Sequence, residues 1–127
     1  MIVPGFRIVA GFGCRDSATE DSLQSALDLA CADQPQPRAL ATLAAKAQHL
    51  APFARTLDLP LIEVSPSALA GQTTLTASDA SRAAHATGSV AEASALAAAG
   101  PGARLLGPRH ISHDRLATCA LASGDLE

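Results

Sequence analysis

Aromatic residues are almost missing from this chain of 127 residues: phenylalanine occurs three times, and tryptophan and tyrosine do not occur. Proteins that bind RNA or single-stranded DNA stack bases on aromatic side chains, so this composition disfavours that class of function. Basic residues are also few, because nine lysines and arginines stand against twelve acidic residues and the formal net charge is −3. Without a basic run or a basic excess, no nucleic-acid partner is expected.

Cysteine is sparse as well. Its three copies, Cys14, Cys31 and Cys119, are far apart and form no CxxC motif. Such an odd, scattered set does not predict a disulfide framework or a structural zinc site, and it fits a reducing compartment. The chain has no uninterrupted apolar run of ~20 residues, the length that spans a membrane. Its amino terminus lacks the charged front and apolar run of a signal peptide. We therefore expect a cytoplasmic protein without a membrane partner.

Hydrophobic residues make up 48% of the chain, which is enough for a core of leucine, alanine, valine and isoleucine. Apolar runs typical of strands alternate with apolar stripes at helical spacing. The expected strands are 8–10, 38–43, 61–64, 103–107 and 116–122, and the expected helices are 19–32, 50–57, 79–86 and 89–99, with one helical turn at 66–70.

This order predicts one domain over residues 1–127. Alternating strands and helices are typical of a three-layer α/β/α sandwich with a largely parallel sheet, here of about five strands. The connection 108–115 is short enough for a hairpin, so the last two strands are expected to be an antiparallel pair. The predicted fold class is therefore α/β with a mixed sheet, mostly parallel with an antiparallel C-terminal pair.

The segment from Ile8 to Glu20 is predicted to be a buried strand, a two-glycine turn and the start of a helix. Gly11 and Gly13 allow positive φ and leave room for a ligand to approach the backbone. Ser17 and Glu20 have capping-box spacing. Free N–H groups and a helix dipole attract anions, and Arg15 adds a positive charge. The alternative is a tight turn that needs glycine and binds nothing.

A second candidate region begins at Thr42. Pro52 is tolerated best in a first helical turn, so the next helix is expected to start near Leu50 or Ala51. Lys46 then lies in the loop before this helix. A positive charge there interacts unfavourably with the helix dipole, at a cost of roughly 0.3–1 kcal/mol. This placement favours a ligand-facing lysine, although a solvated surface lysine is the alternative.

Ligands of open α/β sheets bind beyond the carboxyl ends of the strands. We therefore expect Arg15 and Lys46 to converge there with turn N–H groups. Ser89 and Glu92 form a further capping-box match, so the amino end of that helix is a candidate for the same pocket. A pocket of this kind suits a small molecule that carries carboxylates or phosphates.

Catalytic residues are harder to identify from the sequence. Cys14 is predicted to lie at a helix amino terminus beside Arg15, and both features lower a thiol pKa. His49 or His85 could serve as its base, but no motif joins them, so a small packed cysteine is the stronger interpretation. Lys46 is the other weak catalytic candidate.

Two histidines, His110 and His113, have the spacing of a metal pair, with Asp114 as the nearest further ligand. They fall in a predicted loop without another ligand nearby, so a solvated loop is expected and no metal is predicted. No cofactor is expected either.

Several segments together resemble one known family in order along the chain. They are Gly11-Phe12-Gly13-Cys14-Arg15, then Ala41 to Lys46, then Gly88 to Leu96, and finally Leu105 to Ala122. These segments resemble the CobE family of cobalamin biosynthesis, which is similar to the C-terminal domain of CbiG. The length of the chain is similar to that of CobE proteins, in which this domain is free-standing. The resemblance implies a compact α/β fold and a role in making the corrin ring. By position, the resemblance implies these site residues: Gly11, Gly13, Cys14, Arg15, Thr42, Lys46, Ser89 and Glu92.

Three functions follow as hypotheses from this resemblance. The first is binding or handing over a polycarboxylated corrin or precorrin intermediate of the aerobic pathway. The second is an enzyme of the corrin pathway, a hydrolase or ring-modifying enzyme similar to the lactone-opening CbiG proteins. The third is a non-catalytic partner subunit of another cobalamin-pathway enzyme, which exposed apolar surface on an alanine-rich helix would favour.

Overall fold

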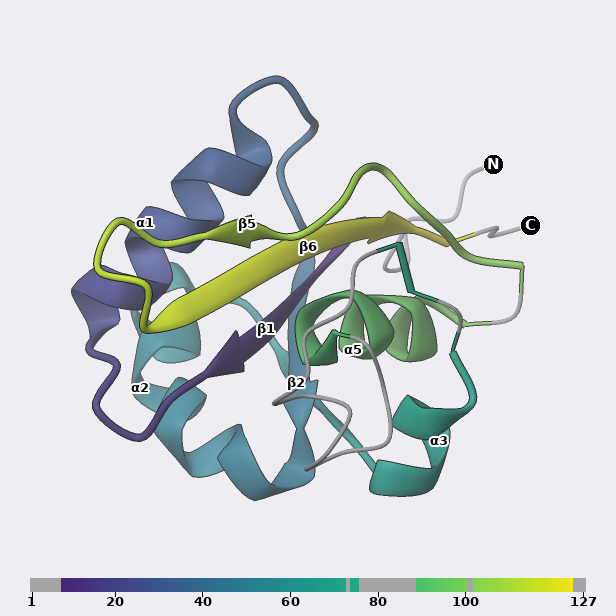
Figure 1. Cartoon of the computed structure of the whole chain (residues 1–127), viewed down its shortest axis with the longest axis horizontal. Helices are drawn as coiled ribbons and strands as arrows, with labels where there is room; N and C mark the ends of the chain where they lie inside the picture. The colour runs from purple at the N-terminus through teal and green to yellow at the C-terminus, as the bar shows by residue number, and fades with distance from the viewer. Residues whose placement is uncertain (1–7, 73, 76–88, 101, 125–127) are drawn as a thin grey trace.

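A mixed β-sheet runs through the molecule with helices on both of its faces, as the computed structural model in Figure 1 shows. The structure describes residues 8–72, 74–75, 89–100 and 102–124. The elements are β1 (Ile8–Cys14), α1 (Glu20–Cys31), β2 (Ala39–Leu43), a 3₁₀ turn (Ala44–Lys46), α2 (Ala47–Leu57), β3 (Leu61–Val64), α3 (Pro66–Ala70), α5 (Val90–Ala99), β4 (Arg104–Leu105), β5 (His110–Ile111) and β6 (Ala117–Ser123).

The strand order is β3-β2-β1-β6-β4, and β5 also pairs with β6. β1 is parallel to β2, and β2 is parallel to β3. β6 is antiparallel to β1, β4 and β5, so it alone runs against the other strands. The predicted α/β class with a mixed, mostly parallel sheet and an antiparallel C-terminal pair is confirmed.

The sheet has six strands rather than the five expected. The additional strand is β5, which lies inside the segment predicted to be a plain connection. His110 pairs with Cys119, and Ile111 pairs with Thr118. Two residues are too short for a periodic signal, so only pairing with the long strand β6 makes this segment a strand.

Two apolar layers hold the helices on the sheet. On one face, α1 and α2 cover residues such as Leu40 and Leu121, and Phe12 meets Phe53 edge to face with 5.9 Å between ring centroids. On the other face, α5 and α3 cover a smaller layer that includes Val9 and Val64. This is the predicted three-layer arrangement, with most of the large core side chains on the α1 and α2 side.

The two glycines of the first candidate segment lie inside β1, so the predicted two-glycine turn is wrong. Gly11 pairs with Ala120 and Gly13 with Thr118, and β1 continues to Cys14. Neither glycine is among the described residues with positive φ. A Cβ on Gly11 would lie 2.1 Å from the Ala91 carbonyl oxygen, so glycine is required here because α5 packs directly onto the strand.

Helix α1 covers the predicted range, but its amino-terminal cap differs from the predicted one. Thr19 is the N-cap, and it forms a capping box with Ser22. Ser17 and Glu20 therefore do not form the box that their spacing indicates, because β1 runs further than expected and the turn after it is shifted toward α1.

Helix α2 begins at Ala47 instead of near Leu50, and Pro52 lies inside it. The 3₁₀ turn that follows β2 leads directly into the helix, so the helix starts before the proline and tolerates it. The helical turn Pro66–Ala70 and the helix that follows Ser89 are confirmed. The helix expected at 79–86 and His85 lie outside the described residues.

Candidate functional site

The carboxyl ends of β1 and β2 meet at one edge of the sheet, and this edge carries the residues that concern function. Arg15 follows β1, and Lys46 lies just beyond β2. The amino end of α5 lies at the same edge, since a Cβ on Gly13 would be 3.4 Å from Val90 Cβ and 3.6 Å from the Ala91 nitrogen. As predicted, Arg15 and Lys46 lie beyond the carboxyl ends of the strands, and a helix begins at the same edge.

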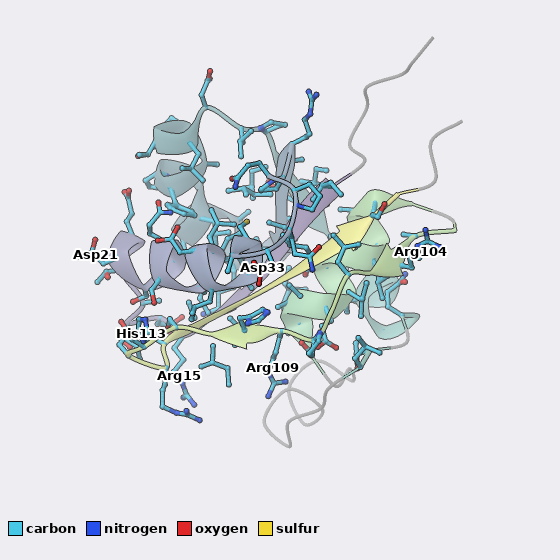
Figure 2. The ribbon with its side chains drawn as sticks, turned by 90° about the horizontal axis from the view of Figure 1, so that it is seen from above. Arg15, Asp21, Asp33, Arg104, Arg109 and His113 are labelled. Carbon is cyan, nitrogen blue, oxygen red and sulfur yellow. The ribbon has the colours of Figure 1, made fainter. Side chains whose placement is uncertain are left out.

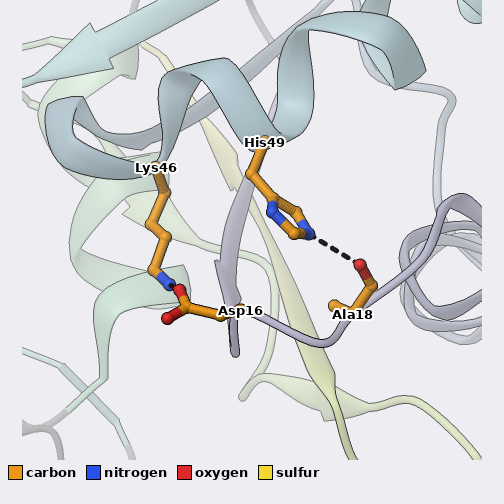
Figure 3. Close-up of polar contacts among 4 residues, drawn as sticks. All are labelled: Asp16, Ala18, Lys46 and His49. Carbon is orange, nitrogen blue, oxygen red and sulfur yellow. Dashed lines mark hydrogen bonds and ion pairs between the residues drawn. The ribbon is translucent and has the colours of Figure 1, made fainter.

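Lys46 is the N-cap residue of α2, and its ammonium donates a hydrogen bond to Oδ1 of Asp16 in an ion pair (Figure 3). The Asp16 side chain is 98% exposed, whereas that of Lys46 is only 25% exposed. The hydrogen bond and the charge of Lys46 hold the pKa of Asp16 below its usual range. Asp16 was not singled out from the sequence as a site residue, because only the folded chain brings it to Lys46.

Two arginines add positive charge to the same side of the molecule. Arg15 is exposed, and its backbone N–H donates to the Leu116 carbonyl at 2.9 Å, which fixes its place beside β6. Arg109 is half-buried and directly precedes β5. In Figure 2 the side chains of Arg15 and Arg109 point to the same side, while Arg104 lies at the far end of the sheet.

Glu92 connects Arg109 to the first turn of α5. Its side chain is fully buried, its Oε2 accepts from the backbone N–H of Arg109 at 2.8 Å, and its Oε1 accepts from that of Leu75 at 2.6 Å. Ser89 caps the helix as predicted, because its Oγ accepts from the backbone N–H of Glu92 at 3.3 Å. The Ser89 half of the predicted capping box is therefore confirmed, and the Glu92 carboxylate joins two loops to the amino end of α5.

The contacts around α5 relate three cationic residues to its first turn by their place in the backbone. The first turn of the helix lies against Gly13, two residues before Arg15. The same turn holds the backbone of Arg109 through Glu92, and Lys46 reaches the neighbour of Arg15 through its ion pair. Cations about a helix amino terminus attract anionic groups through side-chain donors and the helix dipole together.

Other predicted site residues serve the sheet itself. Thr42 is fully buried, and its hydroxyl donates to the Phe12 carbonyl at 2.9 Å on the neighbouring strand. Gly11 is covered by α5. Thr42 and Gly11 therefore have structural roles in the packing of the sheet.

Cys14 is half-buried at the end of β1, where it pairs with Ala117, and not at a helix amino terminus. Burial raises the pKa of its thiol, and Lys46 lowers it by less. The predicted lowering of this pKa is therefore wrong. His49, one of its proposed bases, donates from Nε2 to the Ala18 carbonyl at 2.6 Å (Figure 3). Burial also raises the pKa of Cys31 and Cys119.

His113 and Asp114, two of the three residues weighed as metal ligands, hold the β5–β6 turn to α1. The Asp114 carboxylate accepts from the hydroxyls of Ser22 and Ser112, each at 2.6 Å, and these hydrogen bonds help to lower its pKa. The backbone N–H of His113 donates to Ser25 Oγ at 3.1 Å. Within the described part of the chain, no three His, Cys, Asp or Glu residues are grouped as metal ligands.

A hollow of about 420 Å³ lies at the other edge of the sheet, between the carboxyl halves of α1 and α2. No predicted site residue lines it; Gln24, Asp28, Cys31, Leu57 and Leu59 do. The hollow is therefore separate from the edge that carries Arg15 and Lys46.

Helix α5 does not present the exposed apolar face that would favour a partner subunit. Its residues from Ala91 to Leu96 are buried against the sheet. Leu75 is the large hydrophobic residue that the described part of the chain exposes. Among the helices that the structure describes, none is long and apolar enough to cross a membrane.

The fold and the site together define a small α/β protein of the open, mixed-sheet type, with cationic residues gathered at the carboxyl edge. Residues 8–122 match the family described as Cobalamin synthesis G C-terminus. The chain belongs to this family, which confirms the resemblance seen in its motifs. No curated protein matches the chain.

Solved structures agree with this assignment. CobE, described as a protein from the cobalamin (vitamin B12) biosynthetic pathway, is 28% identical with a TM-score of 0.86, over 100% of this chain and 97% of CobE. The cobalamin biosynthesis protein chiG from Agrobacterium tumefaciens is 36% identical with a TM-score of 0.72, over 94% of this chain and 99% of chiG. A cobalamin biosynthesis protein G homolog from Sulfolobus solfataricus, at 17% identity and a TM-score of 0.70, shares the fold over 94% of this chain and 37% of its own.

Proposed function

We propose that this protein binds a polycarboxylated corrin or precorrin intermediate of cobalamin biosynthesis and hands it to another enzyme of the pathway. The observation that carries the proposal is that Arg15 and Lys46 lie at the edge where α5 begins, and that Glu92 holds the backbone of Arg109 to the first turn of that helix. Family membership supplies the pathway, and the cationic edge supplies the chemistry of recognition.

Corrin intermediates are flat rings fringed with carboxylates, and the edge has donors suited to such a fringe. Arginine binds a carboxylate through two parallel N–H groups, and a lysine adds a point charge. Because the three cations come from three different segments of the chain, they can contact several arms of one ring at once. A chain with a formal net charge of −3 needs such a local patch to attract an anion.

Binding is favoured over catalysis because the thiol at this edge is poorly suited to act as a nucleophile. Burial keeps Cys14 protonated at neutral pH, and a nucleophilic cysteine has to be a thiolate. His49 uses Nε2 on a backbone carbonyl. The role of a partner subunit is not favoured either, because α5 turns its apolar residues inward.

The test is calorimetric titration of the full chain with cobyrinic acid, a corrin that carries free carboxylates. Micromolar binding is expected for the wild type. Arg15→Glu and Lys46→Glu should each weaken it about tenfold or more, since each replaces an attractive charge with a repulsive one. Arg104→Glu is the matched control, because Arg104 is exposed, as Arg15 is, but lies at the far end of the sheet (Figure 2).

No binding by the wild type would overturn the proposal. Normal binding by both edge variants would place the ligand elsewhere. Mass spectrometry after incubation with substoichiometric protein separates binding from chemistry: an unchanged mass is expected, and a changed mass would show turnover instead.

A further inference from the structure

The ion pair between Lys46 and Asp16 has an unequal geometry. The lysine is mostly buried and stands at the amino end of α2, while the aspartate side chain is almost fully exposed. The backbone at Asp16 is held in a turn by the hydrogen bond from Ala18 N–H to the Arg15 carbonyl at 3.0 Å. The carboxylate can therefore leave Lys46 by side-chain rotation alone, without movement of the backbone.

Because the Asp16 carboxylate is almost fully exposed, water and salt screen its ion pair with Lys46, and such a pair contributes little to stability. Another carboxylate can therefore exchange with Asp16 at little cost. A neutral carboxamide cannot do so as well, since its hydrogen bond to an ammonium lacks the second charge.

We infer that Asp16 is a specificity-determining residue: it occupies on Lys46 the place of a ligand carboxylate and gives way to a carboxylate but not to an amide. The inference rests on the proposed function, and it names the ligand more closely, as a ring whose arm at Lys46 is still a free acid. Any reaction that converts this arm to an amide must then follow the binding step.

The inference predicts a gain of affinity from the loss of a contact. Asp16→Asn removes the competing charge and keeps the size of the side chain. Its affinity for cobyrinic acid should rise about two- to fivefold, the range that corresponds to an exposed ion pair. Its affinity for cobinamide, a corrin whose carboxylates have been converted to amides, should not change.

Asp33→Asn is the matched control, because it removes the same charge from an exposed aspartate in the loop before β2, whereas Lys46 lies beyond the other end of that strand. This variant should bind both corrins as the wild type does. If it gains as much as Asp16→Asn, the effect is one of net charge and the inference is overturned.

Three further outcomes also overturn the inference while leaving the proposed function standing. They are equal binding of cobyrinic acid by Asp16→Asn and wild type, weaker binding by Asp16→Asn, and an equal gain for cobinamide. Weaker binding would mean that Asp16 orients Lys46 instead of competing for it. Failure of the wild type to bind cobyrinic acid would overturn the proposed function, and this inference with it.

A spectroscopic readout follows the exchange directly. The ¹⁵N signal of the Lys46 ammonium and the ¹³C signal of the Asp16 carboxylate should both shift when cobyrinic acid saturates the protein. With cobinamide both signals should stay in place, and movement of both with either corrin would contradict the assigned selectivity.

Discussion

At the scale of single residues, Gly11 shows how closely the helix and sheet layers approach. An added Cβ would lie 2.1 Å from the Ala91 carbonyl oxygen and 2.5 Å from the Ala95 nitrogen. Both atoms belong to the backbone of α5, so the whole helix has to move to make room. Overpacking of this kind costs about 1–3 kcal/mol or more.

Gly11→Ala should therefore lower the free energy of unfolding by at least that amount, as measured by urea denaturation followed by circular dichroism. Gly107→Ala is the control, because nothing lies within 4 Å of a Cβ there, and its stability should match the wild type. Equal stability of the two variants would show that α5 does not press on β1.

At the scale of elements, Glu92 joins α5 to two loops. Its buried carboxylate accepts from the backbone N–H groups of Leu75 and Arg109, and its removal would take this acceptor from both of them. Hydrogen bonds to charged groups are worth about 1.5–3 kcal/mol each.

Glu92→Ala should lower the free energy of unfolding by about 1.5–3 kcal/mol or more, and Glu92→Gln by less, because the amide keeps one acceptor oxygen. Glu63→Ala on β3 is the control, since Glu63 is exposed and should change stability little. If Glu92→Ala is as stable as Glu63→Ala, the carboxylate is not the link between α5 and the loops.

At the scale of the whole molecule, two aspartates connect segments far apart in the sequence and contribute to the way stability responds to acid. The ion pair with Lys46 lowers the pKa of Asp16, and hydroxyl donors from Ser112 and Ser22 lower that of Asp114. A carboxyl group with a lowered folded-state pKa stabilises the fold above its unfolded pKa, about 3.9 for aspartate. That contribution is lost as the pH falls through the folded-state pKa.

The double variant Asp16→Asn/Asp114→Asn should be less stable than the wild type at about pH 7 and should lose less stability on acidification to about pH 3. Urea denaturation at several pH values measures this difference. Asp33→Asn should keep the acid sensitivity of the wild type. An unchanged acid dependence in the double variant would mean that these two carboxylates do not link folding to protonation.

Local sequence patterns predicted the elements well where many residues repeat one signal. The alternation of strands and helices gave the fold class, and the spacing of Leu23, Ala26 and Leu27 predicted α1. Two-residue features were missed, as with β5, or misplaced, as with the cap of α1. β5 is a strand only because it pairs with β6. The cap of α1 lies at Thr19 because β1 extends to Cys14 and moves the following turn along the chain.

The sequence also predicted only part of the candidate site, because some of its residues depend on partners that are far apart in the chain. Arg15 and Lys46 could be assigned to one edge because parallel strands end together. Gly11 and Gly13 stood out in the sequence, but the small size needed at these positions comes from the packing of α5 against β1, which no local pattern shows. Arg109 and Asp16 acquire their place only through Glu92 and Lys46.

The sequence by itself determined the class of the fold, the composition of the core and the family, since these depend on periodicity, residue types and ordered motifs. Tertiary structure alone decided which charges meet, because a hydrogen bond or an ion pair depends on distances of a few ångströms between residues that are far apart in the chain. Lys46 therefore has its partner in Asp16, and Glu92 has its partners in two loops, for reasons that only the folded chain contains.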